Sequence, residues 1–387
     1  MDLVAKYGIY RTILSRSFMS VGRGPGQTLA ADARGDSCLH FGDATLFLGW
    51  YLGVLATEFH LLASGLMTAP GLSPRRSLHE LGFALRTLER LKRTAATAFG
   101  PPPPSVPPEA RGFFIRDDVD YGLLAHLPDA TSLESDYLNA NPYNKEESQD
   151  QLFHLLLGLS LVRKFIPPRT FEMRLILGRA RRLAREICAW PSKTRWVIRN
   201  PYAGGKKVNR GDCAIFFSCP VVKALEEIDP RGGELGTSVR WWSKAAWKYL
   251  MRYNLGRIYS ATNLHLVMSL ACQSDTWGRK TLKRLVRLSR KFDWPVYPMV
   301  NIALFADRDA GQPRLRDRLL ERASAMLEAA PPDGLSHSGS PAGWKASHRF
   351  LFERRYQDQG QNSYAGKRFP GLDFLLLHNL FRILESL

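Results

Sequence analysis

The sequence predicts an all-α protein and, within that class, a double-layered (α/α)6 toroid. Two observations lead to this prediction. Hydrophobic residues recur mainly at helical spacing, and nearly continuous apolar helices alternate along the chain with amphipathic, basic ones. A closed ring of helical hairpins needs this alternation, because an inner helix is covered on both sides and an outer helix on one side only. The alternative is an irregular helical bundle.

The expected helices form successive pairs, each with an apolar first member and an amphipathic second member. In chain order the segments are 44–63 and 77–95, 148–165 and 170–190, 262–273 and 277–292, 297–306 and 314–330, with 370–387 as a last apolar helix. A proline-rich loop at 100–110 separates the first pair from the second, since a run of prolines cannot continue a helix. The best strand signals, 194–200 and 213–219, predict at most a small β-hairpin.

The composition allows one large domain or two ordinary ones, and the repeated pairing favours a single catalytic domain over 1–387. With 54 Lys and Arg against 36 Asp and Glu, the formal net charge is +18. Such a charge favours a polyanionic partner, which would be nucleic acid, an acidic membrane or an acidic polysaccharide. The five cysteines are scattered and the metal-binding patterns CxxC and HExxH are missing, so we expect neither a metal nor another cofactor.

The N-terminal residues lack the continuous apolar segment of a secretion signal. The longest apolar tract, 44–56, is too short to span a bilayer and runs into Glu58 and His60. We therefore expect a soluble, cytoplasmic protein.

The second apolar helix begins with residues that can either start a helix or perform chemistry. Ser148 and Gln151 fit a capping box. Asp150 lies in the first turn, where the helix dipole favours its charged form, and His154 follows one turn later on the same face. Gly158, a further turn along, should leave a hollow beside the imidazole. The simpler interpretation is an N-terminal acid and a buried core histidine.

Two other apolar helices also begin with an aspartate. Asp43 precedes the first of them as a natural N-cap, with His40 in the loop before it, and Asp373 lies in the first turn of the last. The inner helices of a toroid run parallel, so their N-termini converge on one rim. We therefore expect Asp43, Asp150 and Asp373 to line one mouth, although capping explains each aspartate singly.

A second acidic element is the segment 112–122. Neighbouring side chains of an extended segment point to opposite faces, so only Asp117 or Asp118 would face a given cleft. Crowded carboxylates raise one another's pKa, while Arg116 lowers it. One of the two aspartates is therefore the candidate general acid, and Asp150 is the candidate base or the group that orients His154. The segment is equally consistent with a charged turn held by Arg116.

Further polar and aromatic residues are candidates for binding a substrate. Trp242 belongs to an aromatic stripe on a basic helix, and aromatic faces stack on sugar rings; a core-packing face is the alternative. The loop before the last helix adds Tyr364, Lys367 and Arg368. The complete set of expected substrate-binding residues is His40, Asp43, Arg116, Gln151, Trp242, Tyr364, Lys367, Arg368 and Asp373.

Four segments together resemble the (α/α)6-toroid carbohydrate-active enzymes. They are 41–59, 113–119, 148–162 and 371–381. The group they resemble includes unsaturated glucuronyl hydrolases and toroidal polysaccharide lyases. In such hydrolases two aspartates on the barrel rim carry the acid–base work, and the positions that resemble them are Asp117 or Asp118 and Asp150. The resemblance raises the expectation for the fold more than for the reaction.

The lyases of the same group imply a different set of roles. There a tyrosine abstracts the proton, while an asparagine, histidine or arginine neutralises the uronate carboxylate. The resemblance would give these parts to Tyr364, His154 and Arg116, whose surrounding motifs differ from those of the family.

Three functions follow from these features. The leading hypothesis is a glycoside hydrolase that cleaves an anionic oligo- or polysaccharide, with Asp117 or Asp118 and Asp150 as its acid–base pair. The first alternative is a polysaccharide lyase with a tyrosine base. The second is a non-catalytic basic protein that binds nucleic acid or an acidic membrane, using the basic helix at 279–291.

Overall fold

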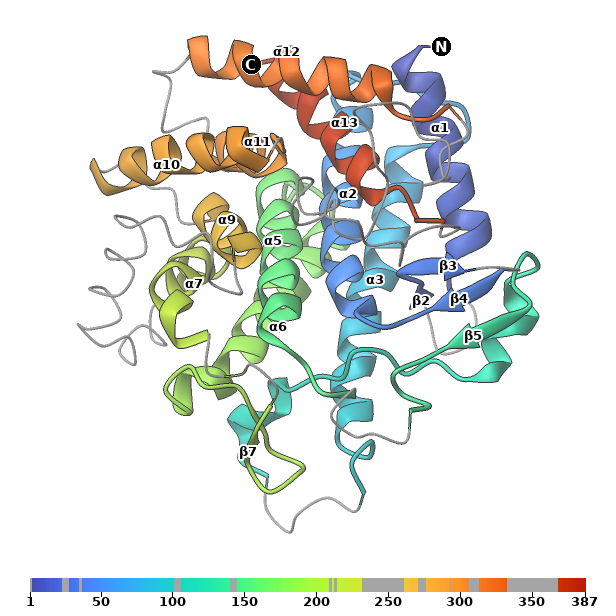
Figure 1. Ribbon diagram of the computed structural model, residues 1–387, viewed down its shortest axis with the longest axis vertical. Helices are drawn as coiled ribbons and strands as arrows, with labels where there is room; N and C mark the ends of the chain where they lie inside the picture. Colours follow the sequence, from blue (N-terminus) through green and yellow to red (C-terminus); the bar gives the residue numbers. More distant parts are fainter. Residues whose placement is uncertain are drawn as a thin grey trace.

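A computed structural model shows a mostly helical protein with small sheets (Figure 1). The residues that it describes are 2–22, 28–34, 37–100, 106–139, 145–208, 211, 214–231, 261–270, 276–292, 294–305, 313–332 and 368–387. The all-α prediction is therefore confirmed at the level of a mostly helical fold.

Each predicted helix that falls within the described residues corresponds to a helix of the structure. The helices are α1 (Leu3–Ile13), α2 (Ala44–Ala63), α3 (Pro74–Ala95), α5 (Gln149–Phe165), α6 (Phe171–Lys193), α7 (Ala214–Ile228), α9 (Ala261–Leu270), α10 (Thr276–Phe292), α11 (Val296–Phe305), α12 (Pro313–Ala329) and α13 (Leu372–Glu385). Of these, α1 and α7 were not predicted from the sequence. A π-helical turn, η1 (Leu14–Phe18), prolongs α1, and two 3-10 helices, η2 (Pro108–Gly112) and η3 (Tyr121–His126), lie between α3 and α5.

The apolar helices pack against one another in chain order. Helix α2 contacts α5, α5 contacts α7, α7 contacts α9, α9 contacts α11, and α11 contacts α13, which in turn contacts α2. Helix α5 also contacts α9 and α11. Each amphipathic helix packs on the apolar helix that precedes it, as α3 does on α2 and α6 on α5. Figure 1 shows α2, α5 and α13 running in the same general direction.

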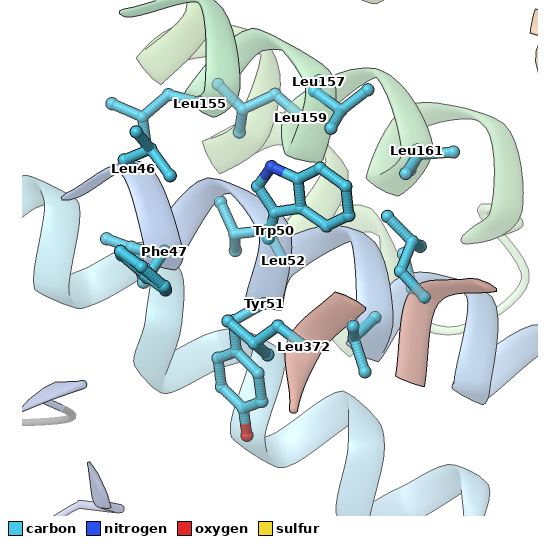
Figure 2. Packing of buried hydrophobic residues seen from close by; sticks show 14 of the residues in the cluster. Leu46, Phe47, Trp50, Tyr51, Leu52, Leu155, Leu157, Leu159, Leu161 and Leu372 are labelled. Atoms are coloured by element: carbon cyan, nitrogen blue, oxygen red, sulfur yellow. The ribbon is translucent and has the colours of Figure 1, made fainter. Parts of the chain in front are cut away.

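Helices α2 and α5 cross so closely that their backbones touch. A Cβ atom on Gly49 would lie 2.3 Å from the carbonyl oxygen of His154, and one on Gly158 would lie 2.2 Å from that of Gly49. The predicted hollow beside His154 is therefore wrong, because the backbone of α2 occupies the space that Gly158 leaves. Figure 2 shows Trp50 projecting from α2 toward the leucines of α5, while Tyr51 points away on the other side of the helix.

The small sheets connect the helices. In one sheet β3 (Asp32–Arg34) pairs antiparallel with β4 (Cys38–His40), which pairs in parallel with β5 (Ser132–Glu134). Strand β1 (Met19–Ser20) pairs with β2 (Thr28–Leu29), and β6 (Arg199–Asn200) pairs with β7 (Lys206–Lys207). The parallel pairing of β4 with β5 brings the loop before α2 beside the loop after β5.

The predicted hairpin between 194–200 and 213–219 is wrong in its second strand. Residues 199–200 are extended, but they pair with 206–207, and 214–228 form helix α7. A short apolar run does not distinguish a strand from a buried helix, and here the apolar residues continue at helical spacing as far as Ile228. The proline-rich segment 101–105 lies outside the described residues.

Helix α2 is long and apolar enough to cross a membrane, when only length and composition are considered. However, 83% of its apolar window is buried against other parts of the protein. The core helix of a globular protein meets the same criterion, so the match is weak support for a membrane span.

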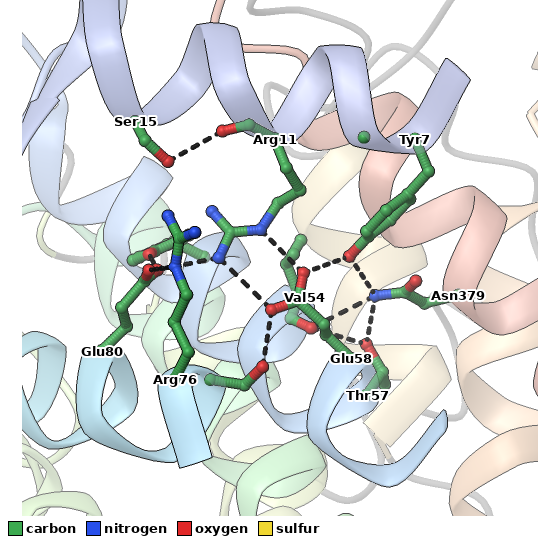
Figure 3. A network of polar contacts seen from close by, with 12 residues as sticks. Tyr7, Arg11, Ser15, Val54, Thr57, Glu58, Arg76, Glu80 and Asn379 are labelled. Atoms are coloured by element: carbon green, nitrogen blue, oxygen red, sulfur yellow. Dashed lines mark hydrogen bonds and ion pairs between the residues drawn. The ribbon is translucent and has the colours of Figure 1, made fainter. Parts of the chain in front are cut away.

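A buried polar network joins α1, α2, α3 and α13 (Figure 3). Arg11 donates from Nε to Glu58 (2.7 Å) and from Nη2 to Glu80 (2.8 Å), and these three side chains are almost completely buried. Tyr7 donates to Glu58 (2.7 Å), and Tyr51 donates to Glu80. The network therefore fixes α1 across the ends of α2 and α3.

The two carboxylates of this network are balanced by two guanidinium groups. Arg76 donates from Nε to the second oxygen of Glu80 (2.9 Å). Burial alone would raise the pKa of Glu80, but the charge of Arg11 and hydrogen bonds from Tyr51, Arg11 and Arg76 lower it below its ordinary value. A buried carboxylate is tolerated only when it is paired in this way.

Candidate active site at the N-terminal ends of α2 and α5

Asp43 occupies the N-cap position of α2 but does not cap the helix. Its backbone adopts the left-handed conformation (φ 64°), and its side chain makes no hydrogen bond to the first turn. The expectation of an ordinary N-cap is therefore wrong. A non-glycine residue in this conformation costs about 1 kcal/mol, so the surrounding contacts must hold it there.

The Asp43 carboxylate is held by residues from two other parts of the chain. Its Oδ1 accepts a hydrogen bond from Gln151 Nε2 (3.0 Å). The same oxygen forms an ion pair with Arg116 Nη1 (3.1 Å). The Asp43 side chain keeps 41% of its surface exposed, while that of Arg116 keeps 20%. Asp43 is thus a half-buried carboxylate that Gln151 and Arg116 hold in one orientation.

The first turn of α5 supplies a second carboxylate. Gln151 Oε1 accepts from the backbone N–H of Ser148 (3.2 Å), and the Ser148 hydroxyl donates to Asp150. The predicted capping role of Gln151 is confirmed, and its amide nitrogen is left to reach Asp43. Asp43 and Asp150 are close enough for the charge of Asp150 to affect the pKa of Asp43. Asp43 and Asp150 therefore lie at the N-terminal ends of neighbouring helices, near enough to interact electrostatically.

Arg116 belongs to one of two extended segments that lie side by side next to this cluster. The bridge between Ile115 and Glu146 holds segment 113–116 beside segment 145–147, and Arg116 Nε donates to the Glu146 carbonyl oxygen (2.8 Å). Arg116 Nη1 also lies 3.7 Å from the carboxylate of Asp136. Its guanidinium is therefore shared between Asp43 and Asp136.

Asp117 supports this arrangement from inside the protein. It accepts hydrogen bonds from the backbone N–H groups of Val119 (3.1 Å) and Asp136 (2.9 Å) and from the Ser135 hydroxyl. Only 2% of its surface is exposed, and burial raises its pKa to about 6 despite these hydrogen bonds. Asp117 thereby positions Asp136. It is too deeply buried to contact a substrate.

His40, at the end of β4, lies beside these residues. Its Nδ1 lies 3.2 Å from Asp32, and its ring lies over Gly42, where a Cβ atom would come within 2.5 Å of Nε2. The charge of His40 acts on Asp136, as does that of Arg116. A glycine at 42 is thus required for the imidazole to lie against the loop before α2.

Two carboxyl groups of this cluster have pKa values above their ordinary value. Desolvation raises the pKa of Asp43, the negative charge of Asp150 raises it further, and Arg116 and the hydrogen bond from Gln151 oppose the rise. Desolvation also raises the pKa of Asp136, against the opposing charges of Arg116 and His40. We call the set Asp43, Arg116, Asp136, Asp150 and Gln151 the acidic cluster. Carboxylates with raised pKa values can donate protons near neutral pH.

Asp118 and His154 were expected to take part in catalysis, but both side chains are buried and bound to other groups of the protein. Arg90 binds Asp118 with two hydrogen bonds (2.6 and 2.9 Å), and the carboxylate side chain is 6% exposed, which is the geometry of a structural ion pair. His154 is completely buried, its Nδ1 lies 2.6 Å from the Asp150 carbonyl oxygen, and burial lowers its pKa to about 4. The geometry of both residues favours a structural role.

Helix α13 begins beside α1. Its N-cap, Gly371, has φ 69° and packs on the ring of Tyr10, where a Cβ atom would come within 2.5 Å. Asp373 is 4% exposed and accepts from the N–H of Phe374 (2.8 Å). Arg368 forms an antiparallel bridge with Ala33 of β3. Three further residues predicted to bind substrate, Trp242, Tyr364 and Lys367, lie outside the described residues.

Some residues of this region carry no recognisable sequence signal. Asp136 follows β5 in an ordinary polar loop, and only the pairing of β4 with β5 brings it to Arg116. Glu147 is buried, accepts from the Phe114 N–H (3.1 Å), and has its pKa raised well above the ordinary value by burial. Within the described ranges, no group of three or more His, Cys, Asp or Glu side chains has the arrangement needed to hold a metal ion.

The acidic cluster therefore combines an oriented, partly exposed carboxylate with a second carboxylate close to it, a guanidinium and an amide. Such a set can transfer protons and orient a polar substrate. Comparisons with protein-family models, with curated proteins and with solved structures give no match to this chain.

Proposed function

We propose that the chain is a carbohydrate-active enzyme that hydrolyses glycosidic bonds at the acidic cluster. The observation that supports this most is the hydrogen bond from Gln151, the neighbour of Asp150 on α5, to Asp43 before α2, which brings the N-terminal ends of two buried helices together. Glycoside hydrolysis ordinarily needs two carboxyl groups beside the scissile bond, one of which holds a proton while the other is ionised.

The roles of the two aspartates follow from their surroundings. Asp43 is the general acid, because desolvation and the neighbouring charge raise its pKa. Asp150 is the base, because the first turn of a helix stabilises a negative charge. Gln151 and Arg116 keep the Asp43 carboxylate in its orientation. This assignment moves the acid from Asp117 or Asp118 to Asp43, since Asp117 is buried and Asp118 is paired with Arg90.

The architecture that we propose for this enzyme is the (α/α)6 toroid. Support comes from the order in which the apolar helices contact one another, which returns from α13 to α2, and from the amphipathic helices packed on them. Helices α2 and α5 run in the same direction, so their N-terminal ends, where the acidic cluster lies, are at the same end of the helix pair (Figure 1).

The proposed substrate is an anionic oligo- or polysaccharide. The net charge of +18 attracts a polyanion over long range. Within the acidic cluster itself the carboxylates outnumber Arg116, so the anionic group of the sugar would have to bind outside it; Arg368, on the neighbouring bridge to β3, is a candidate partner. A purely neutral substrate would make no use of the net charge.

A screen on purified full-length protein tests the proposal. Neutral, uronate-containing and sulfated oligosaccharides are incubated with the wild type, Asp43→Asn, Asp150→Asn and Asp317→Asn, and new reducing ends are measured. Asp317 is exposed on α12 and serves as the matched control. Loss of turnover by at least a hundredfold in the first two variants alone supports the proposal. Unchanged turnover in both would refute it, and an unsaturated product absorbing in the ultraviolet would point to elimination by a lyase.

A second candidate function is the binding of a polyanion without catalysis. Three basic residues, Lys283, Arg287 and Arg290, are exposed at helical spacing on α10. Neutralising phosphates or sulfates with such a stripe makes affinity fall steeply with salt. Titration of labelled RNA and heparin at several salt concentrations tests it: charge reversal of these three residues should abolish binding, and a flat salt dependence would exclude this function.

A further inference from the structure

A second region of the protein has the features of a ligand site. It is a surface pocket of about 430 Å³ that shares no residue with the acidic cluster. The pocket lies where η1 and β1 meet the start of α3 and the end of η3. Its lining residues are Ser15, Arg16, Met19, Ser20, Val21, Arg76, His79, Glu80, His126 and Pro128.

Hydrogen-bond donors from three elements line this pocket. Arg16 and Arg76 contribute guanidinium groups that are 70% and 44% exposed. His79 and His126 contribute imidazoles, the first exposed and the second half-buried. Arg76 and His79 also belong to the first two turns of α3, where the helix dipole favours an anion. The pocket is thus built to attract negative charge.

Among the described lining residues Glu80 is the only carboxylate, and it is already paired. Asp129, beside the lining residue Pro128, pairs with Arg16 across 3.3 Å. Glu80 accepts from Arg76 through one oxygen and from Arg11 and Tyr51 through the other, as Figure 3 shows for its contacts with Arg11 and Arg76. Its charge is therefore balanced inside the protein by the buried network. Because this network fixes the position of Arg76, the guanidinium is oriented before any ligand arrives.

Ser20 gives an independent indication of a ligand. Its side chain is 3% exposed and lines the pocket, yet no residue in the described part of the chain forms a hydrogen bond with its hydroxyl oxygen. Leaving a buried hydroxyl unpaired is unfavourable, and native proteins rarely do so unless a water or a ligand provides the partner. A ligand oxygen in the pocket would satisfy this hydroxyl.

We propose that this pocket binds a phosphate or sulfate monoester of a small molecule. A tetrahedral dianion accepts hydrogen bonds from several directions at once, which suits donors on η1 and β1, on α3 and on η3. A planar carboxylate would engage fewer of them. The pocket volume leaves room for an organic group attached to the anion.

Isothermal titration of the full-length protein with sodium phosphate and sodium sulfate tests the proposal, with sodium chloride at matched ionic strength as the baseline. The double variant His79→Gln/His126→Gln and the single variant Arg16→Gln should each bind phosphate at least tenfold more weakly. Arg75→Gln and His60→Gln remove the same kinds of side chain outside the pocket and should bind as the wild type does. Absence of saturable binding, or equal affinity in all five proteins, would overturn the proposal.

Ser20→Ala separates a ligand contact from a structural role. Because the hydroxyl has no described partner in the free protein, its removal should leave the melting temperature unchanged or raise it, while phosphate binding weakens several-fold. A fall in melting temperature with unchanged phosphate affinity would contradict the assignment. Acetate is the probe for shape: affinity for acetate equal to that for phosphate would exclude recognition of a tetrahedral dianion.

Discussion

Gln151 Nε2 donates to Asp43 Oδ1 across 3.0 Å and so connects the first turn of α5 to the residue before α2. The other end of the same amide accepts from the Ser148 N–H, which begins α5. One side chain therefore starts a helix and also fixes the candidate general acid. The orientation of Asp43 therefore depends on the capping interaction that starts α5.

Gln151→Glu should change catalysis more than stability. The new carboxylate can still accept from Ser148, but it places a negative charge beside Asp43 where the wild type has a donor. Like charges raise one another's pKa, so the basic limb of the kcat/KM profile should move to higher pH by about one unit. In an Asp43→Asn background, the same substitution should move no basic limb in the residual activity. A shift that persists there would show that Asp43 is not the acid.

The crossing of α2 and α5 requires glycine at both contact positions. Gly49→Ala or Gly158→Ala would place a Cβ atom within 2.3 Å of backbone on the facing helix, so the helices must separate. We expect a loss of about 3 kcal/mol or more in the free energy of unfolding, measured with urea. Gly178→Ala on α6 is the matched control: it meets nothing within 4 Å and should stabilise the protein by about 0.5–1 kcal/mol.

This crossing also shows where the sequence was informative and where it was not. The apolar run and Ser148–Gln151 predicted α5 and its start correctly, because capping chemistry is local. The nearness of the start of α5 to Asp43 was expected from parallel neighbouring helices, and the hydrogen bond from Gln151 to Asp43 agrees with it. The contact of Asp136 with Arg116 could not be predicted from the sequence, because it depends on the pairing of β4 with β5, which are separated by nearly a hundred residues. The left-handed backbone of Asp43 likewise has no sequence signal.

Asp117 should make stability depend on pH in a specific direction. Its pKa is about 6 in the folded protein against an ordinary value of 3.8, a difference worth about 3 kcal/mol. Since the folded state holds the proton more tightly, this stabilisation is fully present below about pH 4 and is lost as the pH rises through 6. Asp117→Asn removes the titration. The difference in unfolding free energy between wild type and variant should therefore change by this amount between pH 4 and 7; a constant difference would contradict the burial of this carboxyl group.

His154 should remain neutral over the range in which exposed histidines titrate. Burial lowers the pKa of His154 to about 4, and that of His378 to about 4 as well. Both pKa values lie below the ordinary value of 6.5, so the stability that the neutral rings contribute is present above about pH 6.5 and is lost as the pH falls toward 4. NMR titration of the imidazole signals, assigned with His154→Gln and His378→Gln, measures this directly. A His154 midpoint near 6.5 would instead favour an acid–base role.

The measurement that tests the central claim most directly is cleavage of an acidic oligosaccharide in water enriched in ¹⁸O, followed by mass spectrometry of the products. Hydrolysis at the acidic cluster predicts that the wild type incorporates one ¹⁸O atom for each bond cleaved, and that Asp43→Asn and Asp150→Asn form almost no labelled product while Asp317→Asn matches the wild type. Cleavage without incorporation of ¹⁸O, or labelled product formed at the wild-type rate by both cluster variants, would contradict the account.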